Sequence, residues 1–238
     1  MTEVMRLSKR LIELIHCSRS EAEQYIEGGW VLVDGEIVDE PQFMVQAQKV
    51  ELHPDAVLAP VEPMTILFHL PTPYDPADPT APLKLITPAT RMPDDSSGVR
   101  TLKRHFARLT PTMPLEAGAT GFLVFTQDKR VVKRLVEDAE KNEQEYHVEV
   151  SGKIAEDGLA RLNRSMKFNG WPLPPAKVSW QNEKRLRFAL KNVRAGQIEF
   201  MCKSVGLTVV AMKRIRIGRV PMSLQPGQWR YLPPDTLF

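Results

Sequence analysis

The amino-acid sequence predicts an α+β protein of two units, a small one over residues 1–59 and a larger one over residues 60–238. Residues 5–38 hold a complete helix, turn, helix and hairpin pattern. Residues 54–63 contain three prolines and no helical period, which is typical of a linker. Beyond this linker, short strand-like apolar runs and helical patterns follow one another, so the larger unit also combines both kinds of element.

The small unit has strong local signals. Leucine and isoleucine recur at helical spacing over residues 7–15, and Ser18-Arg19-Ser20-Glu21 has the form of a capping box that opens a second helix. Gly28-Gly29 ends that helix, and Asp34-Gly35 predicts a tight hairpin turn between two strands. At about 55 residues, the unit lies near the lower limit for a domain that folds alone.

In the larger unit, residues 113–128 (M-P-L-E-A-G-A-T-G-F-L-V-F-T-Q-D) hold a loop of small residues followed by the strand-like run Phe122 to Phe125. The loop carries one carboxylate, Glu116. A carboxylate on a loop at a sheet edge can present an acid to a substrate, and a solvated turn residue is the alternative. Other predicted elements are strands at 64–70, 145–150, 178–180 and 185–190, helices at 101–109, 129–138 and 159–166, and a long loop at 71–98.

Composition limits the class of protein. The chain is 42% hydrophobic and 26% charged, without a run near 18 apolar residues, so we expect a soluble, non-secreted, cytoplasmic protein without a membrane span. Cys17 and Cys202 lie far apart, and the five histidines show no metal-ligand spacing. The sequence therefore predicts neither a disulfide framework nor a metal site.

Charge is distributed unevenly along the chain. Residues 1–59 hold 5 basic and 11 acidic residues, whereas residues 184–219 hold ten basic residues and one acid, Glu199. A basic patch of this kind suits a polyanion, because neutralised phosphates release counterions. A solvated basic face is the alternative. Trp171 and Trp180 could stack on bases, but core packing is the preferred interpretation of both.

Residues 5–38 resemble an S4 RNA-binding domain in M-R-L-S-K-R-L, C-S-R-S-E-A-E-Q-Y-I and G-G-W-V-L-V-D-G-E-I-V. The resemblance implies that the first helix and the start of the second form an RNA-binding face. The residues that it places there are Arg6, Lys9, Arg10, Arg19 and Ser20. A small structural appendage with ordinary surface charge is the alternative.

The rest of the chain resembles the ribosomal RNA pseudouridine synthases that carry an S4 domain. Residues 113–128 are similar to their G-R-L-D-x-x-T-S-G-L-L signature, and E-Y-H-V-E-V around Tyr146 is similar to their K-T-Y-L-V strand. The resemblance implies a mixed, mainly antiparallel sheet flanked by helices, and conversion of a flipped-out uridine to pseudouridine without a cofactor. It places Glu116 at the position of the catalytic aspartate, and Tyr146 where the family stacks a tyrosine on the target uracil.

The segment V-R-A-G-Q-I-E-F-M-C-K-S-V-G-L-T-V-V-A-M-K-R-I-R-I-G resembles the last motif of the same family. By this resemblance four residues join the RNA-binding surface: Gln197, Lys213, Arg214 and Arg216. Glu199 stands where the family has the basic residue that pairs with the catalytic aspartate. Pro114, Gly196 and Phe200 replace three further basic residues.

The differences from the family motifs lie at the positions of its catalytic residues. Replacing aspartate by glutamate moves the carboxylate by about 1 Å, and misplacement on that scale costs on the order of a hundredfold in rate. If Glu116 and Glu199 share a site, one of them should be protonated or turned to solvent. We therefore expect a monomeric protein that binds structured RNA, either ribosomal RNA or ribosomal subunits, with lost or much reduced isomerase activity.

Two alternatives remain open. The first is an active synthase that uses Glu116 as its acid, with Lys213 or Arg216 as the cation. The second is a protein-interaction module whose basic surface binds an acidic protein.

Overall fold

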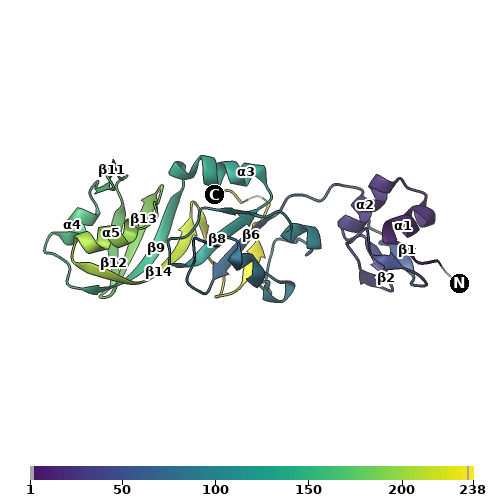
Figure 1. Cartoon of the computed structure of the whole chain (residues 1–238), viewed down its shortest axis with the longest axis horizontal. Helices are drawn as coiled ribbons and strands as arrows, with labels where there is room; N and C mark the ends of the chain where they lie inside the picture. Colours follow the sequence, from purple (N-terminus) through teal and green to yellow (C-terminus); the bar gives the residue numbers. More distant parts are fainter. Residues whose placement is uncertain (1–2, 235) are drawn as a thin grey trace. The chain divides into compact units, whose positions relative to one another are not determined.

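The computed structural model describes residues 3–234 and 236–238 and divides the chain into two compact units (Figure 1). One unit comprises the residues up to Pro63 together with Gly98–Leu109. The other comprises Met64–Ser97 and Thr110–Phe238. The sequence gives no signal that Gly98–Leu109 belongs with the first unit.

The smaller unit has the predicted helix, turn, helix and hairpin. Its helices are α1 (Leu7–Ile15) and α2 (Arg19–Glu27), and its strands are β1 (Met5–Arg6), β2 (Val31–Val33), β3 (Glu36–Ile37), β4 (Met44–Val45) and β5 (Val50–Leu52). The capping box is present, since the Ser18 amide donates to the Glu21 carboxylate at 2.7 Å and the Glu21 amide donates to the Ser18 hydroxyl at 3.3 Å. Asp34 and Gly35 both have positive φ, as the tight turn between β2 and β3 requires.

One apolar cluster holds the smaller unit together. It joins the inward faces of α1 and α2 to the strands, and its buried members are Leu7, Leu11, Ala22, Ile26, Val31, Val33, Val45 and Val50. The helical spacing correctly predicts Leu7, Leu11, Ala22 and Ile26 as buried, whereas Leu14 of the same series is 47% exposed.

The segment Gly98–Leu109 packs on the smaller unit. The Arg100 guanidinium lies 4.8 Å from the ring centroid of Trp30 and donates to the Gly29 carbonyl at 2.5 Å. Lys103 and Arg104 form ion pairs with Glu40 and Glu27. The predicted helix at 101–109 is only the short 3₁₀ turn η3 (Lys103–Phe106), because tertiary contacts, rather than a continuous helical stripe, hold this segment.

The larger unit is built on a nine-stranded sheet with the order β12-β13-β9-β14-β8-β6-β16, to which β7 adds beside β8 and β15 beside β14. Strand β14 pairs with β8 in parallel, whereas the other pairs are antiparallel, so the expected mixed, mainly antiparallel sheet is confirmed. The strands are β6 (Thr65–Leu70), β7 (Thr110–Thr112), β8 (Thr120–Thr126), β9 (Glu143–Gly152), β12 (Lys177–Asn182), β13 (Arg185–Lys191), β14 (Leu207–Ile217), β15 (Val220–Pro221) and β16 (Trp229–Tyr231).

Short helices and one separate hairpin complete this unit. The helices are α3 (Lys129–Val132), which continues into the π-helical turn η4 (Lys133–Glu137), α4 (Gly158–Leu162) and α5 (Gln197–Ser204), with 3₁₀ turns η1 (Ala81–Leu85), η2 (Pro88–Thr90) and η5 (Ala139–Lys141). The hairpin pairs β10 (Lys167–Phe168) with β11 (Trp171–Pro172). The sequence predicts a turn near this place but not the hairpin.

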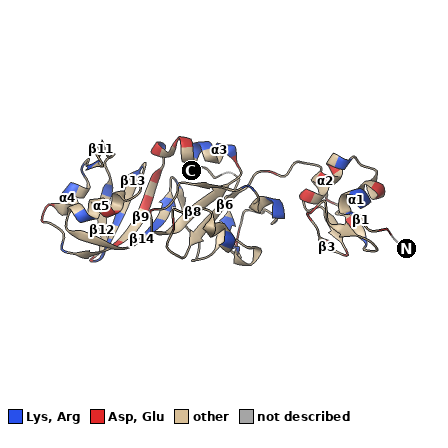
Figure 2. Ribbon diagram, viewed as in Figure 1, with Lys and Arg blue, Asp and Glu red and all other residues tan. Residues whose placement is uncertain are grey.

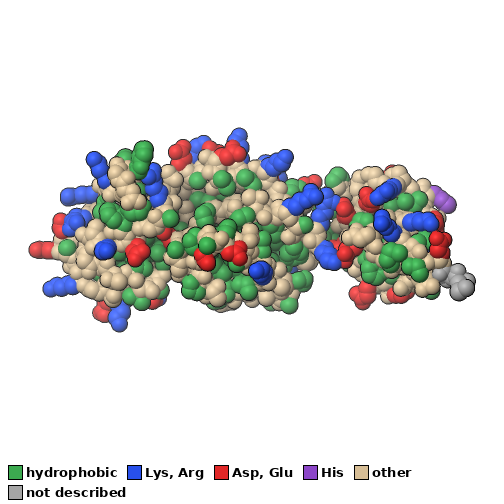
Figure 3. Space-filling model, viewed as in Figure 1, with side chains coloured by type: hydrophobic (Ala, Val, Ile, Leu, Met, Phe, Trp, Pro, Cys, Tyr) green, Lys and Arg blue, Asp and Glu red, His purple; other side chains and the backbone are tan. Residues whose placement is uncertain are grey.

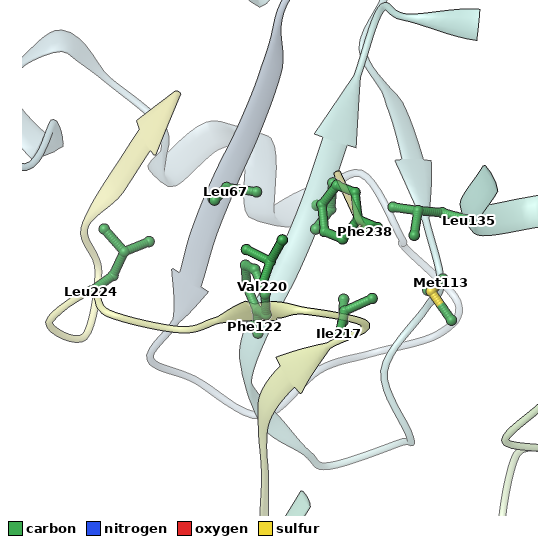
Figure 4. Packing of buried hydrophobic residues seen from close by; sticks show 9 residues of the cluster. Leu67, Met113, Phe122, Leu135, Ile217, Val220, Leu224 and Phe238 are labelled. Atoms are coloured by element: carbon green, nitrogen blue, oxygen red, sulfur yellow. The ribbon is translucent and has the colours of Figure 1, made fainter. Parts of the chain in front are cut away.

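Part of the core of the larger unit lies where β6 and β8 meet the end of β14. Its buried members, eight of them labelled in Figure 4, are Leu67, Met113, Phe122, Val124, Leu135, Ile217, Val220, Leu224 and Phe238. Met113 belongs to this cluster. The loop that carries Glu116 is therefore anchored in the core immediately before that residue.

Within residues 3–234 and 236–238, no helix is long and apolar enough to cross a membrane. The same residues contain no group of three or more histidine, cysteine, aspartate or glutamate side chains arranged to hold a metal ion.

Candidate active site

Glu116 lies on the loop between β7 and β8, and its side chain is buried, with 5% of the residue exposed. The carboxylate accepts hydrogen bonds from the backbone amides of Gly196, at 2.5 Å, and Ile198, at 3.5 Å. These amides belong to the start of α5, where the first N–H groups of a helix have no partner within the helix. Glu116 therefore caps α5 from a different part of the chain.

The environment of Glu116 favours its neutral form. Burial raises the pKa of the Glu116 carboxyl above its ordinary value, and the backbone amides of Gly196, Ile198 and Gln197 oppose this effect only in part. The nearby Glu199 carboxylate raises the pKa further. In the described part of the chain, no lysine or arginine forms an ion pair with Glu116.

Glu199 lies in the first turn of α5, and its side chain is exposed. Of the two outcomes expected when these carboxylates share a site, the structure thus shows the exposed Glu199 turned to solvent, while Glu116 stays buried. Phe200, the next residue, is 36% exposed, and its ring lies 5.1 Å from that of Phe168.

Arg214 on β14 holds the Glu116 loop in place. Its side chain is fully buried, and its guanidinium donates to the carbonyls of Met113 (2.7 Å), Pro114 (3.3 Å) and Phe122 (2.9 Å). It also donates to the Gln144 side chain at 2.7 Å. Because these carbonyls belong to the segment Met113-Pro114 that leads to Glu116, Arg214 fixes the path of the loop rather than neutralising its acid.

Tyr146 on β9 has no exposed surface. Its hydroxyl donates to the Gln144 amide oxygen at 3.0 Å, and its ring centroid lies 6.0 Å from the Arg214 guanidinium carbon. Burial raises the pKa of the Tyr146 phenol. A base needs an open ring face for stacking. The expected stacking on Tyr146 would therefore require the residues that cover its ring to move aside.

The cations predicted for an active site face other groups. Arg216 donates to Glu143 at 2.6 Å and to Glu145 at 2.9 Å, and Glu145 also binds Arg187 at 2.5 Å. Lys213 is half-buried, and burial together with the neighbouring Arg185 lowers its pKa. Neither Lys213 nor Arg216 forms an ion pair with Glu116 among the described residues, so the expectation of a cation from these positions is not met.

Two of the residues predicted to bind RNA are buried and form hydrogen bonds within the protein. Gln197 is 1% exposed, and its side-chain oxygen accepts from the Arg194 amide at 3.0 Å. Arg214 is fully buried with its donors bound to protein groups. Both side chains therefore have a structural role here, and direct RNA contact by either stays a prediction, since sequence spacing does not show which way a side chain points.

The predicted RNA-binding residues of the smaller unit lie at the surface. Arg6 precedes α1, Lys9 and Arg10 lie on α1, and Arg19 and Ser20 begin α2. All are at least partly exposed, and the ion pairs Arg10–Glu13 and Arg19–Glu23 join exposed side chains. Figure 2 shows Lys and Arg on both helices. Such weak pairs can exchange for phosphate contacts.

Comparisons with known proteins agree with this architecture. The S4 domain family matches residues 5–50. The "Uncharacterized RNA pseudouridine synthase" of Aquifex aeolicus (strain VF5) is 28% identical over 233 residues, which cover 96% of this chain and 92% of the relative. The "Ribosomal small subunit pseudouridine synthase A" of Vibrio cholerae is 26% identical over 245 residues, which cover 96% of each. A crystal structure of a pseudouridylate synthase has a TM-score of 0.58 at 20% identity and covers 96% of both chains.

These matches define the class of protein as an S4 domain followed by a domain with the pseudouridine synthase fold. The relatives extend over nearly the whole length of this chain. Over nearly its whole length, the chain is similar to pseudouridine synthases, and its first residues match the S4 domain family.

Proposed function

We propose that this protein binds structured RNA, either ribosomal RNA or ribosomal subunits, as a cytoplasmic monomer with little or no pseudouridine synthase activity. In this account it keeps the scaffold and the RNA-binding surfaces of its family. Ribosomal RNA is favoured because one relative is named for the small ribosomal subunit. The S4 domain and the basic side chains of the larger unit would bind the phosphates of the RNA.

One observation carries the proposal. The buried Glu116, at the position of the family's catalytic aspartate, has hydrogen-bond donors but no ion pair with any described lysine or arginine, and its pKa is raised by burial and by Glu199. A raised pKa favours the neutral form of a carboxyl group, and the neutral form is a poor nucleophile. The absence of a cation beside the acid and the burial of Tyr146 both oppose the reaction of the family.

The direct test maps pseudouridine in ribosomal RNA by mass spectrometry in cells with and without the gene. We expect identical maps. A pseudouridine that disappears on deletion and returns with the wild-type gene would contradict the proposal. Complementation with Glu116→Ala is the matched control. A modification that depends on Glu116 would return with the wild-type gene but not with this variant.

A gain of activity tests the same explanation from the opposite side. The double substitution Glu116→Asp and Glu199→Arg restores the acid and the basic residue expected from the family. If the electrostatics of the site cause the loss, this variant should isomerise uridine measurably faster than wild type in purified ribosomal RNA. Glu116→Asp with Glu199→Gln, which lacks the cation, is the control and should stay near the wild-type level.

A second candidate function is an active synthase with Glu116 as its acid. The observation that favours it is Arg214, whose buried guanidinium lies 6.0 Å from the Tyr146 ring and binds the loop directly before Glu116. This buried positive charge could stabilise an ionised Glu116 once RNA opens the pocket. The candidate predicts that Glu116→Ala abolishes a modification which the wild type performs.

A further inference from the structure

The hairpin of β10 and β11 presents an exposed tryptophan. Trp171 is 63% exposed, so the prediction that it packs in the core is wrong. It pairs across the hairpin with Phe168, and the turn residues Asn169 and Gly170 both have positive φ, as a tight two-residue turn requires. Exposing most of an indole to water is unfavourable unless a partner covers it.

The hairpin is anchored, so the position of Trp171 is well defined. Leu173, which follows β11, is 3% exposed, its amide donates to the Met166 carbonyl at 2.7 Å, and its carbonyl accepts from the Ser165 hydroxyl at 3.0 Å. The Phe168 ring packs against Phe200 on α5. A rigid aromatic ring loses little conformational freedom when it binds a ligand.

A cation accompanies the ring. The Arg194 guanidinium carbon lies 5.8 Å from the Trp171 ring centroid. Arg164 and Lys167, near or within the hairpin, are also exposed. In Figure 3 basic side chains project from the end of the larger unit that carries α4 and β11 in Figure 1. Exposed aromatic and cationic groups together are typical of surfaces that bind single-stranded nucleic acid.

This surface adjoins the candidate active site. Arg194 lies two residues before Gly196, whose amide holds the Glu116 carboxylate. A Cβ atom at Gly196 would lie 3.7 Å from the Phe168 ring, so the hairpin packs close to the start of α5. An RNA chain with one base at Trp171 could therefore also reach the Glu116 loop.

We propose that Trp171 and Arg194 form a platform on which an unpaired RNA base stacks while Arg194 contacts an adjacent phosphate. The proposal rests on the RNA-binding part of the proposed function and is independent of isomerase activity. The planar ring is tolerant of base identity, because every base has a π face. The platform thus gives RNA a fixed contact outside the S4 domain.

The test uses the full-length protein with fluorescein-labelled decauridylate and decaadenylate, and it measures affinity by fluorescence anisotropy at several salt concentrations. Trp171→Ala should weaken the binding of both by roughly fivefold to a hundredfold. Trp171→Phe, which keeps an aromatic ring, should recover most of the affinity. Val210→Ala removes an equally exposed apolar side chain, at 65% exposure, and should leave affinity unchanged.

Salt dependence separates the two members of the platform. Trp171→Ala should leave the slope of log affinity against log salt unchanged, whereas Arg194→Gln should reduce it by about one phosphate contact. Thermal unfolding of each variant verifies the fold. If the wild type binds and Trp171→Ala binds equally well, the platform is refuted while RNA binding stands. If the wild type binds neither oligonucleotide, the platform is refuted, whereas the proposed function fails only if the wild type also does not bind purified ribosomal RNA.

Discussion

Two buried carboxylates of the larger unit have opposite environments. Glu145 on β9 is 8% exposed and binds the guanidinium groups of Arg187 and Arg216, which hold its pKa below the ordinary value. Glu116 is 5% exposed and binds only backbone amides, and burial raises its pKa. Little of either residue is exposed, but desolvation is the main influence on the pKa of Glu116, whereas the hydrogen bond from Arg187 is the main influence on that of Glu145. The fold can thus place arginines around a carboxylate, as it does at Glu145, but among the described residues it places none in an ion pair with Glu116.

The largest effect should come from the residue that fixes the Glu116 loop. Arg214→Met leaves the buried carbonyls of Met113, Pro114 and Phe122 without their charged donor. We expect a loss of about 3 to 5 kcal/mol in the free energy of unfolding, measured by urea denaturation. The neighbouring half-buried Lys213→Met is the control and should cost less than about 1 kcal/mol. Equal losses in the two variants would contradict the anchoring role of Arg214.

A smaller difference should separate the two carboxylates themselves. Glu145→Gln removes the charge that two arginines share, and it should cost about 1 to 3 kcal/mol at neutral pH. Glu116→Gln loses part of its hydrogen bonding but replaces a carboxyl group whose charged form is disfavoured by burial, so its effect should stay below about 1 kcal/mol. The comparison fails if Glu116→Gln is the more destabilising substitution in urea denaturation at neutral pH.

The pH dependence of these variants should have opposite signs. The lowered pKa of Glu145 adds stability that is present above its ordinary value of 4.5 and is lost as pH falls through the folded value. The raised pKa of Glu116 adds stability that is present below 4.5 and is lost as pH rises through the folded value.

Denaturation from about pH 7 to about pH 3 measures both effects. The advantage of wild type over Glu145→Gln should shrink as pH falls, whereas its advantage over Glu116→Gln should grow. Curves that move in the same direction for both variants would show that the two sites are electrostatically alike.

The smallest effect concerns Glu199. Because its side chain is exposed, Glu199→Lys should change the free energy of unfolding by no more than about 0.5 kcal/mol. It should nevertheless lower the pKa of Glu116, since it replaces a nearby negative charge by a positive one. Lys203→Glu, at the other end of α5, is a surface control and should leave the pKa of Glu116 almost unchanged. If the pKa of Glu116 is the same in Glu199→Lys as in wild type, Glu199 does not influence Glu116.

Much of the fold could be predicted from local signals. Ser18 with Glu21, Asp34 with Gly35 and the helical leucines specify the smaller unit, because caps, turns and periodicity act within a few residues. The packing of Gly98–Leu109 on that unit could not be predicted. It depends on Arg100 meeting Trp30 from 70 residues further along the chain, a contact that no local pattern encodes.

The candidate site also has features that could be predicted from the sequence and features that could not. The motif resemblance locates Glu116, Tyr146 and Glu199, but it does not show that Glu116 caps α5 or that Arg214 points into the protein. Motif spacing assigns positions along the chain, whereas the direction of a side chain depends on strand register and packing. Trp171 shows the same limit, since a tryptophan in a short hairpin has no signal for exposure.

The central claim is that the buried acid at position 116, with which no lysine or arginine of the described residues forms an ion pair, has a raised pKa. A ¹³C NMR titration of the glutamate carboxyl groups, assigned with Glu116→Gln and Glu145→Gln, measures this directly. We predict a pKa for Glu116 above the ordinary 4.5 and a pKa for Glu145 below it. A pKa for Glu116 at or below 4.5 would reveal a positive charge that stabilises its carboxylate and would contradict the account.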